Sequence, residues 1–313
     1  MKPCRTDDMA KLDRALADDS PYIAEEKFDG CRYYSIGNRL FSSHLAAKDQ
    51  LPVEKTYQLS GISEQLTRFG NAILDGEIYI PGKASYDVAS ITNSHSANGS
   101  HALRYVVFDI LALPDGTDIT RYNWGTRRKI LEQLFDGAQL SLITLSSYRD
   151  TEKAEFLQHL WKDQKEGVVL KNVTGKYVIG KRPMWNWIKI KRFVTEEVRI
   201  VGFVEPTMLY TGGHYDSWPY WYHQSSKKFV KTLGSVPVTK TFYRGWIGAI
   251  EIGHLDGQYA GCVSGFDESI REYISNNQQE CIGKIIEISA MERLASGLYR
   301  HPTFIAFRED LNG

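Results

Sequence analysis

Hydrophobic and polar positions alternate in short runs along most of the chain, a pattern that is typical of β-strands with one buried face. The clearest signal in the first part is a pair of runs at residues 32–36 and 39–43, separated by Gly37 and Asn38, which favour a two-residue hairpin turn. Spacing near 3.6 residues predicts helices between the strands. Besides the hairpin we expect strands at residues 73–80, 103–113, 167–171 and 187–190, and helices at residues 11–19, 127–135 and 153–165.

The pattern changes after residue 193. From there on, glycines and polar turns separate short apolar runs, which predict strands at residues 198–204, 228–233, 246–254, 259–264 and 284–290, with one helix at 267–276. The charge changes at the same place: residues 1–193 carry 27 basic and 24 acidic side chains, and residues 194–313 carry 11 and 14. We therefore expect two domains, an α+β domain over residues 1–193 with antiparallel sheets and a small β-barrel or sandwich over residues 194–313.

The composition indicates a globular protein. Its 313 residues, 42% of them hydrophobic, suffice for one large domain or two ordinary ones. Lys+Arg and Asp+Glu both number 38, which excludes the strongly basic composition of a passive nucleic-acid coat but permits a local basic cleft. The four cysteines have no metal-binding spacing, no signal peptide precedes them, and no apolar run is long enough to span a bilayer. We expect free thiols and a cytoplasmic location.

Residues 25–32, with the sequence EEKFDGCR, are the most informative segment. A lysine between an expected strand and a glycine turn, with an arginine five residues on, has two interpretations. One is a solvated turn with surface charges. The other is a lysine nucleophile, Lys27, whose neutral amine is favoured by desolvation or by nearby cations such as Arg32, which also suits phosphate oxygens.

Further motifs follow in order along the chain. They are LDGE at residues 74–77, VFD at 107–109, RRKILE at 127–132, EGVVLK at 166–171 and WIKIK at 187–191. Together with the first segment, this series resembles the nucleotidyltransferase motifs of ATP-dependent DNA ligases. The pattern KxDGxR alone also occurs in mRNA capping enzymes, but EGVVLK and WIKIK are more similar to DNA ligases. In the second part, residues 248–266 resemble the OB domain of these ligases, and residues 300–310 resemble their last motif.

The resemblance implies the fold and the reaction. It implies an adenylation (nucleotidyltransferase) domain followed by an OB-fold domain, in a compact enzyme of phage or bacterial type. It also implies that Lys27 attacks the α-phosphate of ATP, that AMP passes from Lys27 to the 5′-phosphate at a nick, and that the 3′-hydroxyl then displaces AMP. All three steps move charge onto phosphoryl oxygens, so catalysis rests on positioning, cations and a divalent metal, Mg²⁺ or Mn²⁺.

The resemblance also assigns roles to other side chains. Lys189 and Lys191 contact the phosphates, and alternation along a strand puts both on one face. Glu166 holds the metal, and Glu77 binds the ribose hydroxyls and also the metal. The remaining assignments are Glu25 and Phe108 to adenine, Arg32 to phosphate, Asp29 to the nick ends, and Arg308 to the pyrophosphate leaving group. For several of these residues an ordinary structural role is an equally natural interpretation: a solvated strand face for the two lysines, a turn for Glu166, and a core aromatic for Phe108.

Three features depart from the family pattern or add to it. His44 stands where these ligases commonly have arginine, which leaves open a weaker phosphate contact or a plain surface position. Leu311 stands where the last motif usually has lysine. Residues 210–229 interleave aromatic side chains with Lys227 and Lys228, which suits either a DNA-contacting loop or an aromatic cluster that covers one end of the barrel.

We expect a monomeric ATP-dependent DNA ligase that seals nicks between a 5′-phosphate and a 3′-hydroxyl in duplex DNA, with functions in DNA replication, repair and recombination. An RNA ligase or a capping-type nucleotidyltransferase uses the same lysine chemistry and stays open as an alternative. So does a non-catalytic nucleic-acid-binding protein that contains an OB fold. Because the net charge is zero, affinity for DNA must come from local patches, and we expect binding that weakens steeply with salt.

Overall fold

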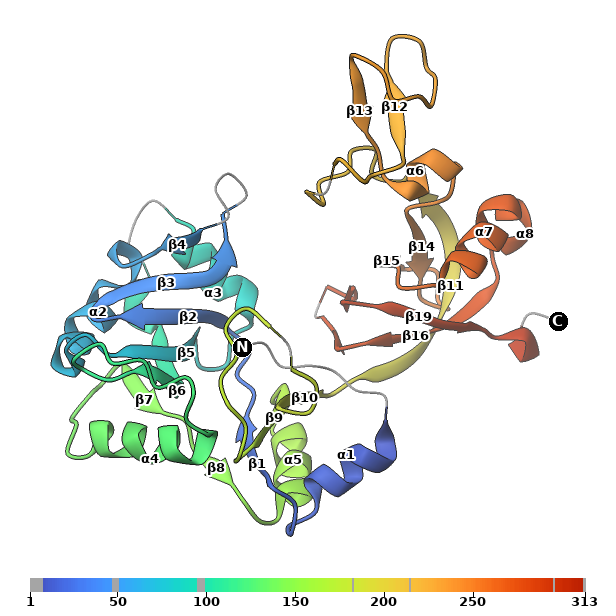
Figure 1. Cartoon of the computed structure of the whole chain (residues 1–313). Coiled ribbons are helices and arrows are strands. Elements are labelled where there is room, and N and C mark those ends of the chain that lie inside the picture. Colours follow the sequence, from blue (N-terminus) through green and yellow to red (C-terminus); the bar gives the residue numbers. More distant parts are fainter. Residues whose placement is uncertain are drawn as a thin grey trace. The chain divides into compact units, whose positions relative to one another are not determined.

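The computed structural model describes residues 8–46, 51–94, 99–181, 183–213, 215–294 and 296–311 (Figure 1). The chain divides into two compact units, Met1–Lys191 and Arg192–Gly313, and our expected boundary after residue 193 lies two residues further on. The first unit mixes helices and strands, whereas the second is mostly β-structure, as expected. Over the described ranges no helix combines the length and the apolar character that crossing a bilayer requires.

The described part of the first unit contains two sheets and five α-helices. Its strands are β1 (Tyr22–Glu26), β2 (Cys31–Ile36), β3 (Arg39–Leu45), β4 (Pro52–Glu54), β5 (Ile73–Tyr79), β6 (Arg104–Ala112), β7 (Ile143–Leu145), β8 (Tyr148–Arg149), β9 (Gly167–Asn172) and β10 (Trp187–Lys191). Its helices are α1 (Met9–Leu16), α2 (Ser60–Leu66), α3 (Ser85–Thr92), α4 (Trp124–Phe135) and α5 (Lys153–Lys162). The expected hairpin, the four other expected strands and the three expected helices are present, with ends shifted by no more than three residues. The short strands β4, β7 and β8 and the helices α2 and α3 were not predicted.

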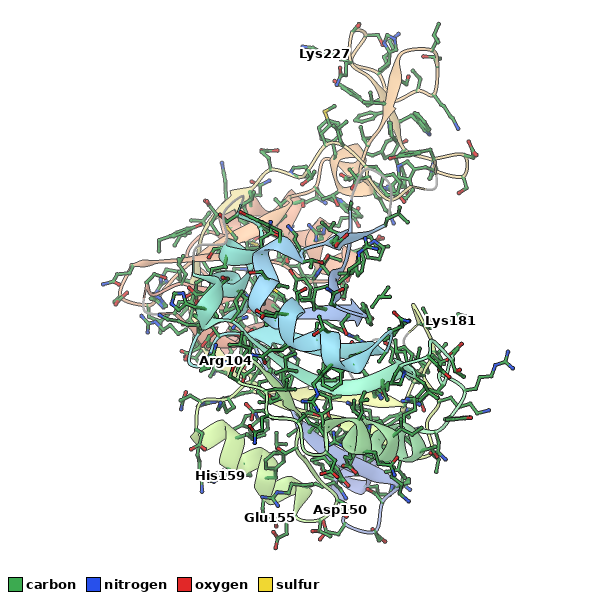
Figure 2. The ribbon with its side chains drawn as sticks, turned by 90° about the vertical axis from the view of Figure 1, so that its left-hand side faces the viewer. Arg104, Asp150, Glu155, His159, Lys181 and Lys227 are labelled. Carbon is green, nitrogen blue, oxygen red and sulfur yellow. The ribbon has the colours of Figure 1, made fainter. Side chains whose placement is uncertain are left out.

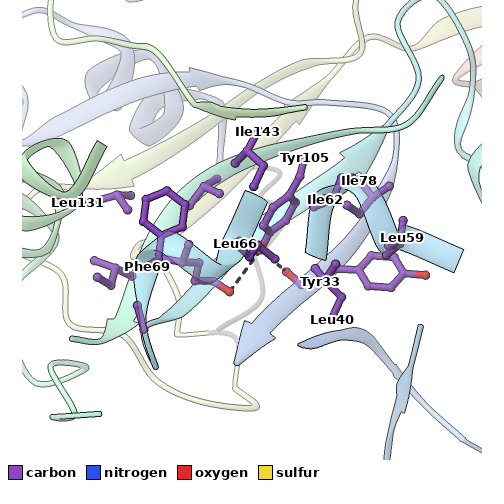
Figure 3. Close-up of a cluster of buried hydrophobic side chains, with 14 of the residues drawn as sticks. Tyr33, Leu40, Leu59, Ile62, Leu66, Phe69, Ile78, Tyr105, Leu131 and Ile143 are labelled. Atoms are coloured by element: carbon purple, nitrogen blue, oxygen red, sulfur yellow. Dashed lines mark hydrogen bonds between the residues drawn. The ribbon is translucent and has the colours of Figure 1, made fainter. Parts of the chain in front are cut away.

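The larger sheet has the strand order β4-β3-β2-β5-β6-β7 and is antiparallel except between β6 and β7. The β2–β3 turn is the predicted hairpin, and Gly37 has a φ of 58°, a left-handed conformation that glycine adopts without strain. One face of the sheet packs against the main hydrophobic core (Figure 3). In this core the Tyr105 hydroxyl donates to the carbonyl oxygens of Tyr33 and Leu74, at 3.2 and 3.3 Å, so the buried phenol keeps its hydrogen bonds.

The smaller sheet has the order β10-β9-β1-β8, with all pairs antiparallel. Its register places Glu25, Val169 and Lys189 side by side on one face. The opposite face is apolar, with Ala24 and Leu170 among the residues that pack against α1 and α5. Because successive strand residues point to opposite faces, burial of the apolar face against the two helices leaves a row of charged side chains on the other face.

The second unit contains a five-stranded sheet in the order β15-β14-β11-β16-β19. A parallel bridge between Ser264 and Thr303 links the two edges of this sheet, and the Phe304 amide donates to the Ser264 carbonyl at 2.9 Å. The strand order and this closure are those of a small, partly open barrel. The strands are β11 (Val194–Val204), β14 (Ala249–Gly253), β15 (Tyr259–Val263), β16 (Ile285–Ala290) and β19 (Thr303–Phe307). The helices are α6 (Lys240–Arg244), α7 (Glu268–Asn276) and α8 (Gln278–Cys281).

A two-stranded ribbon, β12 (Trp221–His223) with β13 (Ser235–Pro237), is inserted between β11 and β14, and a second ribbon pairs β17 (Glu292–Arg293) with β18 (Tyr299–Arg300). The strand that we expected at residues 228–233 is wrong, because those residues form the loop and turn between β12 and β13. The aromatic side chains of this region contact one another: the Tyr210 and Trp218 rings stack with centroids 3.6 Å apart, and Tyr222 lies against Phe229. These contacts match the aromatic-cluster interpretation. Figure 2 shows Lys227 at the outer end of the loop.

Candidate active site

A pocket that is partly open to solvent lies where the two sheets of the first unit face each other. One wall comes from the charged face of β1, β9 and β10, and the other comes from β2, β5 and β6. The lining residues are Glu25, Glu26, Lys27, Phe28, Arg32, Glu77, Phe108, Val169, Lys171 and Trp187. Five residues that the sequence assigned to nucleotide chemistry are therefore in one pocket: Glu25, Lys27, Arg32, Glu77 and Phe108.

Lys27 directly follows β1 at the edge of this pocket. Its amide donates to the carbonyl oxygen of Gly167 at 2.9 Å, and its Nζ lies 2.6 Å from Oε2 of Glu166. The Nζ of Lys191 lies 2.5 Å from the other oxygen of the same carboxylate. Gly167 has a φ of 141°, and a Cβ at this position would overlap the carbonyl oxygen of Ile190. Glycine is thus required for the close strand approach that lets one carboxylate bridge both lysines.

Glu25 is 2% exposed and projects from β1 into the pocket wall. Its Oε2 accepts from Lys171 Nζ at 2.8 Å and from the Ser146 hydroxyl at 3.2 Å. Its Oε1 is buried and has no hydrogen-bond partner among the described residues. Burial raises the pKa of Glu25, although Lys171 opposes this, and burial lowers the pKa of Lys171. An unsatisfied acceptor in a pocket wall is a position where a bound molecule can supply the missing donor.

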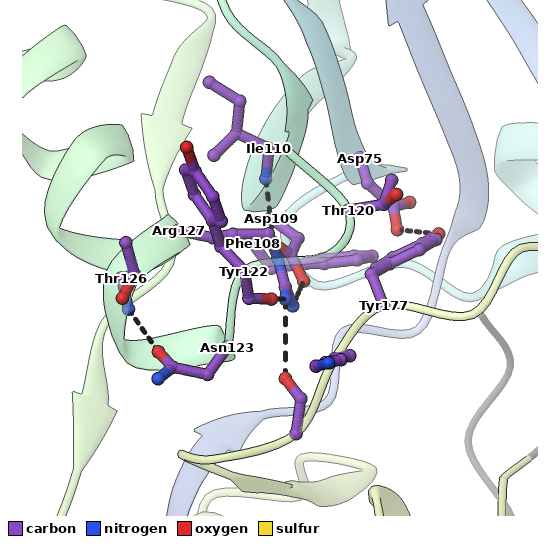
Figure 4. A network of polar contacts seen from close by, with 12 residues as sticks. Asp75, Phe108, Asp109, Ile110, Thr120, Tyr122, Asn123, Thr126, Arg127 and Tyr177 are labelled. Atoms are coloured by element: carbon purple, nitrogen blue, oxygen red, sulfur yellow. Dashed lines mark hydrogen bonds and ion pairs between the residues drawn. The ribbon is translucent and has the colours of Figure 1, made fainter. Parts of the chain in front are cut away.

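Arg32 is held by a buried carboxylate on the next strand. Its Nε and Nη2 lie 2.8 and 2.5 Å from the two oxygens of Asp75, whose side chain is fully buried. The Tyr177 hydroxyl donates to Asp75 at 2.8 Å (Figure 4) and accepts from Arg32 at 3.0 Å. Asp75 raises the pKa of Arg32 against the opposing effect of burial, so the guanidinium stays charged in the pocket.

Two aromatic rings form the apolar part of the pocket. The ring centroids of Phe108 and Trp187 lie 5.9 Å apart in an edge-to-face arrangement. Lys171 Nζ lies 4.7 Å from the Phe108 ring centroid and 4.5 Å from that of Trp187, so its charge is stabilised by both rings as well as by Glu25. A planar base is a suitable ligand for this wall because its faces and edges make the same contacts that the rings make with each other.

The residue after Phe108 anchors this part of β6. Asp109 and Arg127 form a fully buried ion pair with two hydrogen bonds of 2.8 Å, and Arg127 also donates to the Tyr122 carbonyl at 2.6 Å (Figure 4). The Ile110 amide donates to the same carboxylate at 2.9 Å. Arg127 belongs to α4, so the pair fixes the helix against the strand that carries Phe108.

Glu77 and Glu166 supply the carboxylates expected to hold a divalent metal. Burial raises the pKa of Glu77 to about 8; Lys27 and Arg32 counteract this shift, and Glu166 adds to it. Two neighbouring carboxylates beside Lys27 and Arg32 have the oxygen donors that Mg²⁺ uses, together with waters and phosphates. Among the described residues, no group of three or more His, Cys, Asp or Glu is arranged as a metal site. The two carboxylates fit part of an oxygen-ligand set of this kind.

The remaining residues assigned from the sequence lie outside the pocket lining. Lys189 pairs opposite the pocket residue Val169 and shares a strand face with Lys191. Asp29 lies in the segment between Lys27 and β2, near enough to Cys31 to act on its pKa. His44 is exposed on β3, where its carbonyl accepts from Ser42.

Three assigned residues belong to the second unit. Arg308 donates to both oxygens of Asp310, at 2.9 and 2.7 Å, and forms an ion pair with Glu197 on β11. These carboxylates, with Asp310 contributing most, raise the pKa of Arg308. Lys227 and Lys228 are exposed in the loop after β12.

Several residues of the site were not predicted. Lys171 and Trp187 belong to the motifs EGVVLK and WIKIK. Because they lie on the same expected strands as assigned residues, the sequence could have predicted them as site residues. Asp75 was likewise part of LDGE. Ser146 and Tyr177 have no comparable signal, because they reach the pocket through contacts with residues more than 100 positions away in sequence.

The site lies within the segment that matches a known family. The sequence model described as "ATP dependent DNA ligase domain" matches residues 5–191. The chain belongs to the ATP-dependent DNA ligase family. The match covers the whole first unit apart from its first four residues and includes every pocket-lining residue of this ligase family member.

Relatives with known names cover parts of the chain. The chain is 34% identical over 133 residues to the "Multifunctional non-homologous end joining protein LigD" of Mycolicibacterium smegmatis, covering 42% of this chain and 16% of that protein. It is 26% identical over 185 residues to the protein of the same name from Pseudomonas aeruginosa, covering 58% of this chain and 21% of that protein. The ligase family chain therefore spans less than a quarter of the length of these two relatives.

Solved structures share the fold along the whole chain. One, described as "DNA binding with a minimal scaffold: Structure-function analysis of Lig E DNA ligases", superposes with a TM-score of 0.67 at 16% identity and covers 98% of both chains. Another, described as "Pmar-Lig_Pre.", superposes with a TM-score of 0.68 at 19% identity and covers 98% of this chain and 67% of that one. Both units thus have the architecture found in solved ligase structures.

Proposed function

We propose that this protein is an ATP-dependent DNA ligase that seals nicks through a covalent Lys27–AMP intermediate. One observation carries the proposal. Lys27 stands at the mouth of a pocket that combines an aromatic wall, a buried carboxylate oxygen without a partner among the described residues, and a charged arginine. These features suit the binding of a base and of phosphates beside a nucleophile. The family match over residues 5–191 supports the same conclusion.

In the first step the Lys27 amine attacks the α-phosphorus of ATP. A nitrogen–phosphorus bond forms, the bond from the α-phosphorus to the bridging oxygen breaks, and pyrophosphate leaves. The amine must lose a proton, and Glu166, 2.6 Å from Lys27 Nζ, is placed to accept it. Lys191 on the other side of Glu166, and Lys189 on the same strand face, supply positive charge for the phosphoryl oxygens.

The base binds between the aromatic wall and Glu25. Phe108 stacks on the ring, and Oε1 of Glu25, which has no partner among the described residues, accepts from the 6-amino group of adenine. Guanine in the same pose would present its 6-oxo oxygen to a carboxylate oxygen, two acceptors facing each other. An unsatisfied pair of this kind is costly in a buried site, so the pocket favours ATP over GTP.

Glu77 binds the ribose, and together with Glu166 it provides the oxygen ligands for Mg²⁺ or Mn²⁺. When bound, such a metal neutralises charge on the phosphates. The residues themselves position the nucleotide: Glu77 is on β5 opposite Arg32 on β2, so ribose and phosphate contacts come from adjacent strands.

AMP then passes from Lys27 to the 5′-phosphate at a nick, and the 3′-hydroxyl attacks that phosphate and expels AMP. Asp29, next to the nucleophile, acts near the nick ends in these steps. For the second unit, which has the strand order of an OB fold, we propose two functions. Arg308 orients the pyrophosphate during adenylation, and Lys227 and Lys228 contact DNA phosphates. His44 is an exposed candidate for a further phosphate contact.

The test is incubation with ATP labelled at the α-phosphate and with Mg²⁺, followed by peptide mass spectrometry. We expect AMP on Lys27 and none on the variant Lys27→Ala. A matched control is Lys162→Ala, which removes an exposed lysine of α5 that does not line the pocket and should leave labelling unchanged. Ligation of nicked DNA without an adenylate on Lys27 would contradict the proposal.

Substrates separate the alternatives. Nicked duplex DNA, nicked RNA and RNA with a 5′-diphosphate end are offered with ATP or GTP to the same preparation. We expect joining of nicked DNA with ATP. Guanylylation with transfer to the RNA end would indicate a capping enzyme, and the absence of any nucleotide adduct would indicate a binding protein.

A further inference from the structure

A chain of four buried polar groups runs from α4 to the pocket. Arg128 donates from Nη1 to the Ser146 hydroxyl oxygen at 3.2 Å and from Nη2 to the Ser146 carbonyl at 2.6 Å. The Ser146 hydroxyl donates to Glu25 Oε2 at 3.2 Å, and Lys171 donates to the same oxygen at 2.8 Å. All four residues are buried, with Ser146 3% exposed. The sequence motifs of the site include neither Ser146 nor a role for Arg128.

The direction of each hydrogen bond in this series of four groups follows from the donors and acceptors that each side chain has. A guanidinium has no acceptor, so Ser146 must accept from Arg128 and has only its single proton left to give. That proton points to Glu25. With two donors on Oε2, the other oxygen, Oε1, is left without a partner in the part of the chain that the structure describes. Glu25 lines the pocket, so a molecule bound there can supply the donor that this oxygen lacks.

We propose that Ser146 is a positioning residue for nucleotide selection: it fixes the Glu25 carboxylate so that Oε1 stays an acceptor for the 6-amino group of the base. This inference rests on the proposed function and deepens it. Ser146 does not line the pocket. Its hydrogen bond holds the Glu25 carboxylate in one orientation. Without this bond the carboxylate can rotate, and Oε1 is no longer reserved for the base.

A purely structural role for the hydroxyl is a weak explanation. The bond between Arg128 and the Ser146 carbonyl, which ties α4 to the segment between β7 and β8, does not depend on the side chain. Arg128 keeps a further partner in Glu132, at 2.7 Å, and stacks over the Tyr148 ring at 4.9 Å. Replacing Ser146 by alanine therefore removes the contact to Glu25 and leaves the anchoring of the helix in place.

The test compares ATP with purine riboside 5′-triphosphate, which lacks the 6-amino group. Adenylate-type adduct formation on Lys27 is measured as kcat/KM for each nucleotide, for wild type and for Ser146→Ala. We expect the wild-type preference for ATP to fall roughly tenfold in Ser146→Ala, the effect of one hydrogen bond to a charged group. The rate with purine riboside triphosphate should change less than about twofold. The ratio of the two rates does not depend on how much of the variant is folded.

Two variants control the result. Ser146→Thr keeps the hydroxyl and should restore the preference for ATP. Ser63→Ala removes another buried serine hydroxyl, which donates to the Asn38 carbonyl at 2.8 Å. Neither Ser63 nor Asn38 lines the pocket, so this variant should leave the preference for ATP unchanged.

The outcomes separate this inference from the proposed function. An unchanged nucleotide preference in Ser146→Ala, or an equal loss with both nucleotides, overturns the role of Ser146 while the ligase assignment stands. Absence of any adduct on wild-type Lys27 overturns the proposed function itself.

Discussion

Replacing Asp75 by asparagine tests how strongly the buried carboxylate supports the pocket. Asp75 lies 2.8 and 2.5 Å from Arg32 and accepts from Tyr177 at 2.8 Å, with a side chain that is fully buried. Asparagine has nearly the same shape, so the substitution removes the charge without leaving a cavity. It leaves the Arg32 guanidinium, whose side chain is 13% exposed, without this counter-charge.

The magnitude follows from burial. Removing one member of a buried ion pair costs about 3–5 kcal/mol, because the remaining charge stays desolvated. Tyr177→Phe keeps the ion pair but removes the hydroxyl that donates to Asp75 and accepts from Arg32, and it should cost about 1.5–3 kcal/mol. The matched control is Glu54→Gln. Glu54 binds Arg39 through the same two-bond geometry, 3.1 and 2.5 Å, but on the surface, where water and salt screen the pair.

The assay is urea denaturation followed by tryptophan fluorescence and by far-UV circular dichroism. At a slope of about 2 kcal/mol per molar urea, Asp75→Asn should lower the midpoint of the first unit by roughly 2 M, Tyr177→Phe by about half as much, and Glu54→Gln by no more than the error. The reasoning is refuted if Asp75→Asn leaves the midpoint unchanged, or if the surface variant Glu54→Gln loses as much stability as Asp75→Asn.

Three further predictions concern single groups. Burial and two nearby carboxylates raise the pKa of the Cys31 thiol to about 11 from an ordinary 9.0. Its alkylation by iodoacetamide should therefore be about a hundredfold slower at pH 8 than that of an ordinary thiol, and the rate should still increase towards pH 11. A rate that reaches a plateau by pH 9, measured by peptide mass spectrometry, would exclude this shift. In titrations of nicked DNA, the double variant Lys227→Ala, Lys228→Ala should reduce the slope of the log binding constant against log salt concentration by about 1.8 if both lysines neutralise DNA phosphates. An equal slope for the double variant and wild type argues against these contacts. Phe108→Leu should raise the KM for ATP in adenylate formation roughly two- to tenfold by removing the ring stack, whereas an unchanged KM would place the base elsewhere.

Local patterns were sufficient to predict most elements of the first unit. The hairpin between β2 and β3 depends on Gly37 and its left-handed φ of 58°, a property of a few consecutive residues. The same holds for α4, where Asn123 caps the first turn by accepting from the Thr126 amide at 2.8 Å. Alternation along β10 was enough to put Lys189 and Lys191 on one strand face.

Local pattern failed where tertiary contacts decide the conformation. Residues 228–233 have strand-like composition, but the ribbon pairs β12 with β13 through Tyr222 and Val236, and the intervening residues form a loop in which Lys227 has a positive φ of 55°. Phe229, the aromatic residue of this segment, packs instead against Tyr222 and Phe242.

The sequence by itself determined the order of the elements, the chemical identity of Lys27 and its companion motifs, and the family to which the chain belongs. Only the tertiary structure decided which polar and charged side chains, distant in sequence, contact each other. Glu25 binds Lys171, 146 positions away, and Asp75 binds Tyr177, 102 positions away. Ser146 and Lys171 both donate to one oxygen of Glu25, and the other has no partner among the described residues. The physical reason is that strand periodicity specifies which face a side chain takes, whereas the pairing of distant strands specifies what faces it.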